Sequence, residues 1–201
     1  MFKRFLAVVA LTLSVAVPTL AAESPQAMIE QTSQQVLQSL RDNRAELDRD
    51  PSGVYALVEK QILPHFDFGT MSRWVLGRNW RSASPEQRDQ FVEAFKVFLV
   101  NRYAGALLEY SNEQLRFPPA PTADGDDVTV RSEIVLKRGK PIPVNYSLHR
   151  NKQGEWKVYD VTIEGVSLVT NYRNSFADQI RAGGMDSLIA KLQERNAQSR
   201  L

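Results

Sequence analysis

The residue types that carry most enzyme chemistry are sparse in this sequence and are not grouped. Its two histidines lie in unrelated settings: His65 sits in a proline-flanked turn, and His149 falls at a polar position of an alternating stretch. Local hydrogen bonding and solvation are the expected roles of these side chains. Among the carboxylates, Asp67 is placed to cap a short helix, and Glu164 precedes a turn at Gly165. These residues predict no metal site and no bound cofactor.

Asp160 is the carboxylate whose role the sequence leaves open. We expect it on the same strand face as Trp156 and Val158, where large apolar neighbours would raise its pKa and allow it to act as a proton-transfer base. A hydrogen-bonded structural carboxylate is the commoner alternative. Nucleophilic catalysis has little support, because the chain has no cysteine and no histidine paired with a serine in a recognisable pattern. Phosphate-binding glycine loops and nucleophile elbows are also absent from the sequence.

The first 22 residues predict a secretory signal peptide. Lys3 and Arg4 form a basic start, residues 5–17 are uncharged and largely apolar, and the small residues Ala21 and Ala22 mark the expected cleavage point. The apolar run is shorter than the roughly 20 residues that a membrane-spanning helix needs. We therefore expect residues 1–22 to be removed and residues 23–201 to form a single soluble, exported domain.

The formal net charge of +2 comes from this predicted signal peptide. Two of the 25 Lys and Arg residues precede residue 23, whereas all 23 Asp and Glu residues follow it, so the mature chain carries 23 charges of each sign. A nearly neutral chain has no pervasive attraction to polyanions. Nucleic acid is therefore not an expected partner, and the lack of cysteine excludes disulfides and a lipid-modified N-terminal cysteine.

Helix signals dominate the first half of the mature chain. N-cap residues are expected at Ser24, Asp50, Asp67 and Ser84. The helix after Asp50 should stop before a proline at position 64, the next should end at Gly77, and the one after Ser84 should be the longest, running to about residue 110. Its broad apolar stripe is rich in aromatic residues, and a packed core explains that stripe at least as well as a ligand site does.

The second half alternates with the period of strands. Segments 128–136, 142–149 and 156–163, separated by short turns, predict an antiparallel meander. In the third segment we expect Trp156 and Val158 on one face and Tyr159, Val161 and Ile163 on the other, so that both faces are covered.

A change to helical spacing follows the last strand. With Ser167 as N-cap, Leu168, Tyr172 and Phe176 fall on one stripe of a helix, and two glycines at 183–184 separate it from a final helix. The predicted fold class is α+β, with helices packed on one face of a curved antiparallel meander sheet and enclosing an apolar cavity.

Two segments of the chain resemble the MlaC family, the toluene-tolerance type of periplasmic phospholipid-binding protein. The segments are WVLGRNWRSASPEQRDQFVEAFKVFLVNRYAGALLEY (74–110) and EWKVYDVTIEGVSLVTNYRNSFADQIRAGGMDSLIAKL (155–192). The second is the more specific, because its Trp, Asp, Glu-Gly and Asn-Tyr-Arg choices occur at one fixed spacing. The likeness extends over almost the whole mature chain.

This resemblance implies a periplasmic carrier that moves phospholipid between an outer-membrane lipoprotein and porin complex and an inner-membrane complex of an MCE-domain protein with an ABC transporter. Acyl chains are implied to lie in the cavity, with the headgroup near solvent. The candidate lining, with Arg173 near the mouth, is Trp80, Phe95, Leu99, Tyr103, Leu107, Val144, Tyr146, Leu148, Val161, Ile163, Leu168, Tyr172, Arg173 and Phe176.

Two other classes stay open on the residues alone. An isomerase-type enzyme of the same cone-shaped α+β architecture would act on an apolar substrate with Asp160 as its base. A periplasmic adaptor protein with an ordinary filled core would bind no lipid. The carrier, which needs no catalytic residue, is the favoured interpretation.

Overall fold

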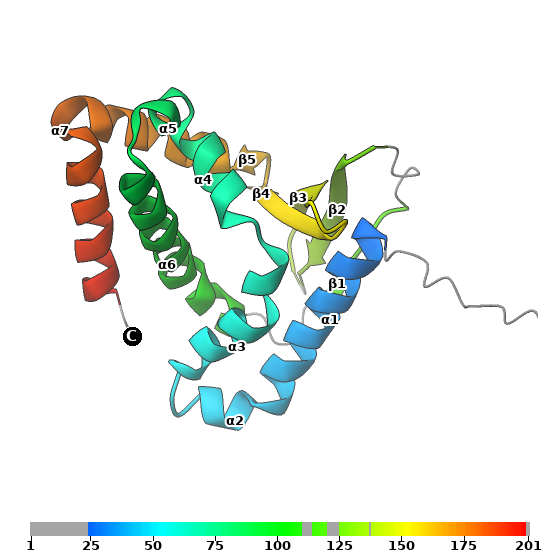
Figure 1. Cartoon of the computed structure of the whole chain (residues 1–201). Helices are drawn as coiled ribbons and strands as arrows, with labels where there is room; N and C mark the ends of the chain where they lie inside the picture. The colour runs from blue at the N-terminus through cyan, green and yellow to red at the C-terminus, as the bar shows by residue number, and fades with distance from the viewer. Residues whose placement is uncertain (1–23, 110–113, 120–124, 137, 200–201) are drawn as a thin grey trace, which may run out of the picture.

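A computed structural model describes residues 24–109, 114–119, 125–136 and 138–199. The predicted signal peptide lies outside these residues. The helices lie to one side of a twisted sheet, and the N-terminal helix runs alongside the sheet before the chain turns back (Figure 1). This arrangement confirms the predicted α+β class.

The N-terminal helices are α1 (Pro25–Asp42), α2 (Arg44–Leu47), α3 (Gly53–Gln61) and the 3-10 helix η1 (Leu63–His65). Helix α1 begins at its predicted cap, but the N-cap of α3 is Ser52 and not the predicted Asp50, and the short α2 and η1 were not predicted. The Ser24 side chain accepts a hydrogen bond from the Ala27 amide, which satisfies one of the free N–H groups at the start of α1. Helix α3 ends at Gln61, ahead of the proline in η1, as expected.

The central helices are α4 (Phe68–Leu76), α5 (Arg78–Ser82) and α6 (Pro85–Glu109). Asp67 caps α4 by accepting from the Thr70 amide at 2.8 Å. Ser84 and Gln87 form a reciprocal capping box at the start of α6, with bonds of 3.0 and 3.1 Å between each side chain and the other's amide. These two caps confirm the predicted starts of α4 and α6.

The sheet contains five strands in the order β1-β2-β3-β4-β5, all antiparallel. The strands are β1 (Gln114–Arg116), β2 (Asp127–Val135), β3 (Ile142–Arg150), β4 (Trp156–Ile163) and β5 (Val166–Ser167). The predicted meander corresponds to β2, β3 and β4. The short edge strands β1 and β5 are not among the predicted elements.

A β-bulge in β4 overturns the predicted division of its two faces. Leu148 pairs with Val158 and Ser147 pairs with Asp160, so Tyr159 is the extra residue. Because one extra residue reverses the alternation, Val158 and Val161 share the face that packs against α1, and Asp160 lies on the opposite face of the sheet. The expectation that Asp160 shares a face with Val158 is therefore wrong.

The C-terminal helix α7 (Leu168–Gln198) is one element with a sharp turn inside it (Figure 1). Ser167 caps it as predicted, accepting from the Thr170 amide at 3.0 Å. Gly184 has φ 80° and ψ 178°, a conformation that interrupts the helix and that side chains rarely adopt. The predicted interruption at the glycine pair is confirmed, and the second half of α7 folds back along α6.

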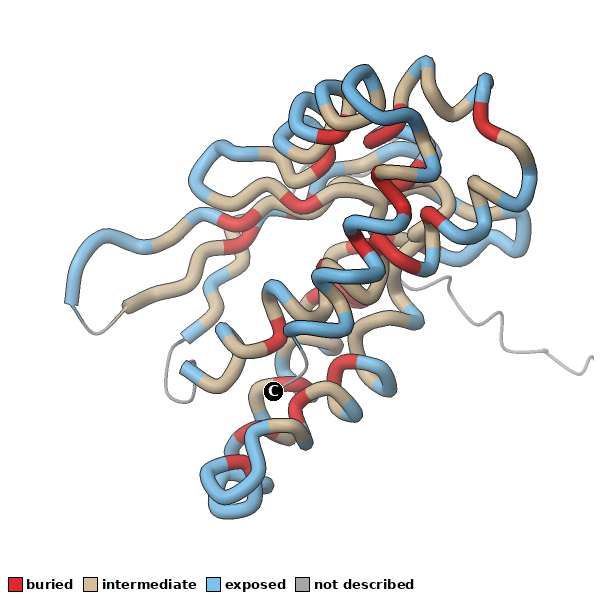
Figure 2. Tube along the Cα trace, turned by 90° about the vertical axis from the view of Figure 1, so that its left-hand side faces the viewer, coloured by how far each residue is buried: buried red, intermediate tan, exposed pale blue. Residues whose placement is uncertain are grey.

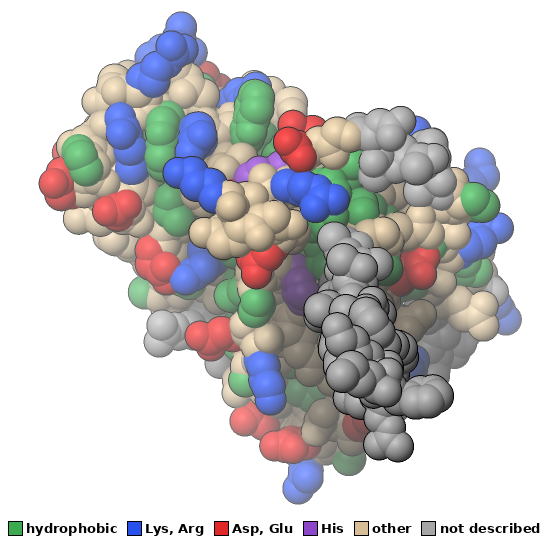
Figure 3. Space-filling view, turned by 45° about the vertical axis from the view of Figure 1, so that its right-hand side comes forward, with side chains coloured by type: hydrophobic (Ala, Val, Ile, Leu, Met, Phe, Trp, Pro, Cys, Tyr) green, Lys and Arg blue, Asp and Glu red, His purple; other side chains and the backbone are tan. Residues whose placement is uncertain are grey.

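Most buried residues lie on helices and strands (Figure 2), and the apolar ones form three clusters. One lies between α4, α6 and α7, one between the sheet and α1, and one between α1, α3 and α6. Acidic and basic side chains are interspersed on the face that Figure 3 presents. In the part of the chain that the structure describes, no helix combines the length and apolar character needed to span a bilayer.

Candidate functional site

Two adjoining apolar chambers lie between the sheet and the helices. The larger, which we call the α6 chamber, has a volume of about 440 Å³, and the smaller α1 chamber has a volume of about 200 Å³. Side chains from α3 to β3 line both chambers, namely Ile62, Phe66, Leu107, Ile134 and Tyr146. The chambers are therefore two parts of one cavity, in the size range of ligand sites.

The α6 chamber is bounded by α3, α4 and α6 on one side and by the strands on the other. Its walls include Phe68 and Met71 of α4, the helix that Asp67 caps. Ala104 and Ala106 of α6 also line it. These small residues leave space where a larger side chain would fill the chamber.

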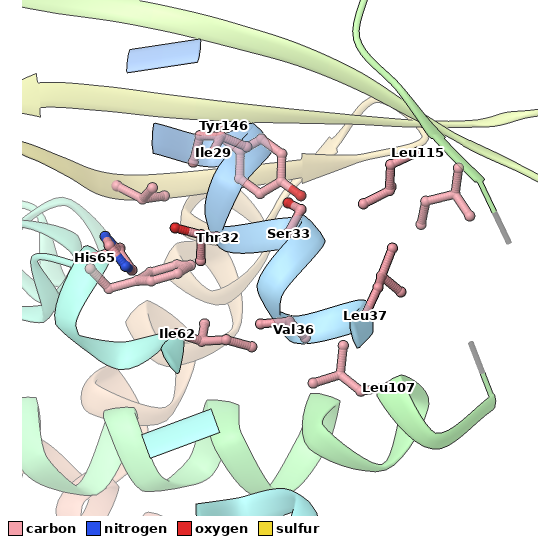
Figure 4. Close-up of a pocket in the computed structure, with 13 residues that line it drawn as sticks. Ile29, Thr32, Ser33, Val36, Leu37, Ile62, His65, Leu107, Leu115 and Tyr146 are labelled. Atoms are coloured by element: carbon pink, nitrogen blue, oxygen red, sulfur yellow. The ribbon is translucent and has the colours of Figure 1, made fainter. Parts of the chain in front are cut away.

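The α1 chamber is closed on one side by the inner face of α1 (Figure 4). Ile29, Val36 and Leu37 contribute apolar surface, and Thr32 and Ser33 add hydroxyl groups to the lining. Tyr146 enters from β3. Burial raises the pKa of the Tyr146 hydroxyl, and Ser132 offsets this only in part, so Tyr146 is neutral at physiological pH.

The structure brings together many of the residues predicted to line the cavity. All of the following line the α6 chamber: Leu99, Tyr103, Leu107, Val144, Tyr146, Val161, Ile163 and Leu168. They come from α6, β3, β4 and the start of α7, which are far apart in sequence. The bulge in β4 is what turns Val161 toward this chamber.

Six predicted residues line neither chamber: Trp80, Phe95, Leu148, Tyr172, Arg173 and Phe176. Leu148 is fully buried in the sheet core. Phe95 and Phe176, at most 1% exposed, pack edge to face with ring centroids 5.6 Å apart in the cluster between α4, α6 and α7. Tyr172 joins the same cluster, and Trp80 packs at its edge under the Arg88 guanidinium.

Two of these six residues make polar contacts outside the cavity. Arg173 donates from Nε to the Trp74 carbonyl at 2.8 Å and so ties α7 to α4 instead of standing near the mouth. The Tyr172 hydroxyl lies 3.2 Å from that of Tyr103, which does line the α6 chamber. Burial and this contact raise the pKa of Tyr172 well above its ordinary value, so it stays neutral at physiological pH.

Sequence reasoning missed a large part of the lining. The face of α1, the aromatic pair Phe66 and Phe68, and Ile134 and Ile142 of the sheet all contribute to it. Phe66 bridges to Val158 beside the bulge, and the Asp67 amide donates to the Val158 carbonyl at 2.9 Å. An apolar stripe on α1 and two phenylalanines around a helix cap were the available signals, but both also suit ordinary packing.

The carboxylates with a possible chemical role are held by structural contacts. Asp160 accepts from the Ser167 hydroxyl at 2.6 Å and from the Val169 amide at 3.1 Å, and it lines neither chamber. Asp67 lies 2.9 Å from His149 Nε2 in addition to capping α4. Burial opposes ionisation of Asp67, but hydrogen bonds from Thr70 and His149 outweigh it and lower its pKa.

Three comparisons with known proteins bear on this cavity. The family model described as MlaC protein matches residues 30–194. The Toluene tolerance protein ttg2D of Pseudomonas putida is 32% identical over 169 residues, covering 84% of this chain and 78% of that relative. The Intermembrane phospholipid transport system binding protein MlaC of Haemophilus influenzae is 29% identical over 182 residues, covering 89% and 85%.

A solved structure shares the fold. The phospholipid-binding protein from Ralstonia solanacearum, determined in complex with a phospholipid, superposes with a TM-score of 0.80 at 35% sequence identity, covering 89% of this chain and 100% of that one. The family match extends from α1 to the second half of α7 and so includes both chambers and the aromatic cluster. This chain belongs to the MlaC family.

Proposed function

We propose that this protein is a periplasmic phospholipid carrier, which shields acyl chains in its cavity while it moves phospholipid between the outer and inner membranes and so maintains outer-membrane lipid asymmetry. The observation that carries this proposal is the two-part apolar cavity between the sheet and the helices. Its support is the 35% identical Ralstonia protein of the same fold, whose structure contains a phospholipid. The Haemophilus relative, named as a phospholipid transport binding protein, supports the same assignment.

The lining suits a carrier that must release its cargo. At about 0.8 kcal/mol per buried methylene, two acyl chains with roughly 30 methylenes gain on the order of 24 kcal/mol relative to water, beyond the limit of about 18–21 kcal/mol for non-covalent complexes. Exchange with a bilayer is therefore the relevant process. Chains pass between two apolar environments, and the cavity needs only to match the bilayer closely enough for uptake and release.

The direction of transport must come from other proteins. We propose as partners an inner-membrane MCE-domain protein of an ABC transporter complex and an outer-membrane lipoprotein–porin complex. In the same scheme, residues 1–22 are the cleaved signal peptide and residues 23–201 form the mature lipid-binding domain in the periplasm.

The alternatives receive less support from the geometry. Asp160 is engaged by two donors and lies away from both chambers, which argues against its use as a base on an apolar substrate. A filled-core adaptor has no need of small residues such as Ala104 and Ala106 beside an open chamber. The carrier needs neither a base nor a filled core.

The test is mass spectrometry of the mature protein purified without detergent, first under native conditions and then after organic extraction. We expect stoichiometric phospholipid, whose mass also gives the number of acyl chains held. A folded protein free of phospholipid in both measurements would contradict the carrier proposal.

A further inference from the structure

Glu164 is an acidic residue in the otherwise apolar and uncharged lining of the α6 chamber. Of the described residues around the two chambers, it is the one with a carboxylate side chain, and the others there are apolar or hydroxyl-bearing apart from His65. Glu164 and Ala106 of α6 are also the exposed members of the α6 chamber lining. The carboxylate therefore stands where this chamber opens to solvent.

The backbone at Glu164 is one that a glutamate rarely adopts. Glu164 and Gly165 form the two-residue turn between β4 and β5, with φ of 51° and 83°. Such a turn, with both central residues at positive φ, favours Asn-Gly or Asp-Gly, because other side chains are strained there. The Glu164 amide donates to the Pro143 carbonyl at 3.0 Å and holds the turn against β3.

Contacts within the protein do not explain why a glutamate occupies position 164. Its carboxylate makes no hydrogen bond or ion pair with the residues that the structure describes. Neither the turn nor its surroundings thus require an acid at this position. An acidic side chain held in a strained conformation at the mouth of a cavity points instead to a ligand group of opposite charge.

Two cationic side chains lie at the same end of the sheet as Glu164. Arg138 and Lys140 are exposed in the turn between β2 and β3, just before Ile142, which lines the α6 chamber. The Glu164 amide bonds to the carbonyl of Pro143, which lies in β3 three residues after Lys140. The end of the sheet beside the chamber therefore carries cationic groups on the β2–β3 turn and an anionic group on the β4–β5 turn.

We propose that Glu164 is a headgroup-selecting residue, whose carboxylate pairs with the cationic group of a zwitterionic phospholipid while Lys140 and Arg138 face its phosphate. This inference rests on the proposed carrier function and names its preferred cargo: phospholipids with an ethanolamine-type headgroup over anionic ones such as phosphatidylglycerol. A solvent-exposed ion pair changes a binding equilibrium by roughly two- to fivefold. The carrier is thus selective by that factor and still carries other phospholipids.

The matched variants are Glu164→Asn and Glu194→Gln. Asparagine suits a positive φ, so the first removes the charge without breaking the turn. Glu194 is an exposed residue of α7 that lines neither chamber, so the second removes a carboxylate elsewhere. Each mature protein is loaded from vesicles of equimolar phosphatidylethanolamine and phosphatidylglycerol, reisolated without detergent and extracted for lipid quantification. A parallel set of vesicles replaces phosphatidylethanolamine with phosphatidylcholine.

We expect the wild-type protein and Glu194→Gln to hold roughly two- to fivefold more phosphatidylethanolamine than phosphatidylglycerol, and Glu164→Asn to hold them in nearly the vesicle ratio. If phosphatidylcholine is also enriched over phosphatidylglycerol, the selection depends on the positive charge alone. If only phosphatidylethanolamine is enriched, the selection depends on hydrogen bonds from its ammonium group. Unchanged headgroup ratios in Glu164→Asn at full lipid stoichiometry would overturn the proposal. Failure of the carrier function itself looks different, since no variant would then hold phospholipid.

Discussion

Replacing Phe176 with alanine should destabilise the fold and leave lipid content unchanged. The ring is 1% exposed and contacts the rings of Phe91, Phe95 and Tyr172 at centroid distances of 5.8, 5.6 and 5.5 Å. Phenylalanine-to-alanine changes at such sites cost about 3–5 kcal/mol of unfolding free energy. For a domain of this size, each kcal/mol lowers the melting temperature by about 2–4 °C, which gives a drop of roughly 6–20 °C.

Ala106→Trp should instead leave the stability of the fold unchanged and lower its lipid content. Ala106 is exposed on α6 and lines the α6 chamber, so an indole there takes up part of about 440 Å³ without entering the packed core. The change in helix propensity is worth only about 0.7 kcal/mol or less. We therefore expect near wild-type stability together with a large fall in bound phospholipid.

Thermal unfolding followed by circular dichroism, combined with phosphorus and lipid quantification of protein purified without detergent, separates the two effects. Ala56→Trp, at an exposed position of α3 that lines neither chamber, is the matched control and should change neither property. Loss of lipid from folded Phe176→Ala protein would show that Phe176 contacts the lipid, and full lipid content in Ala106→Trp would show that the α6 chamber does not hold it. Either result would refute the assignment of Phe176 to the core and of Ala106 to the cavity.

Three further changes test single contacts. Asp160→Ala should lower the unfolding free energy by about 1–2 kcal/mol without loss of lipid, because the carboxylate accepts a hydrogen bond from the Val169 amide at the start of α7. Chemical denaturation measures this free energy, and loss of lipid at unchanged stability would contradict the structural role of Asp160. The pKa of Asp67 lies below its ordinary value of 3.8, so the stability it contributes is full above that value and is lost as pH falls through the lowered pKa. Acid unfolding curves of wild type and Asp67→Ala should therefore converge in that window, and a constant gap would show that the hydrogen bonds from Thr70 and His149 do not lower this pKa. Glu164→Asn should raise stability by about 1 kcal/mol by relieving positive-φ strain, whereas an unchanged melting curve would mean that the turn is not strained.

Local signals in the sequence are strong enough to place most elements. The caps at Ser24, Asp67, Ser84 and Ser167 all make the expected hydrogen bonds, because a cap depends on residues within one helical turn. The three alternating segments form the predicted meander for the same reason. Edge strands of two or three residues, such as β5, carry too little pattern to be recognised.

The long apolar stripe on α6 shows what local sequence patterns cannot predict. Periodicity predicts correctly that Phe95 and Leu99 share one side of the helix and are buried. It does not say what covers them. Both belong to the buried cluster between α4, α6 and α7, but Leu99 also lines the α6 chamber and Phe95 does not.

The chain alone determined the number and order of the main helices and strands, the α+β class, and the membership of a family whose segments recur in it at fixed spacing. The tertiary structure decided which apolar side chains meet one another and which surround an empty space. A single extra residue in β4 turned Val161 toward the cavity and Asp160 away from it, a reversal that depends on pairing with β3. The cavity itself depends on contacts between distant segments, since α1, α6 and the sheet each contribute one wall and none encloses it alone.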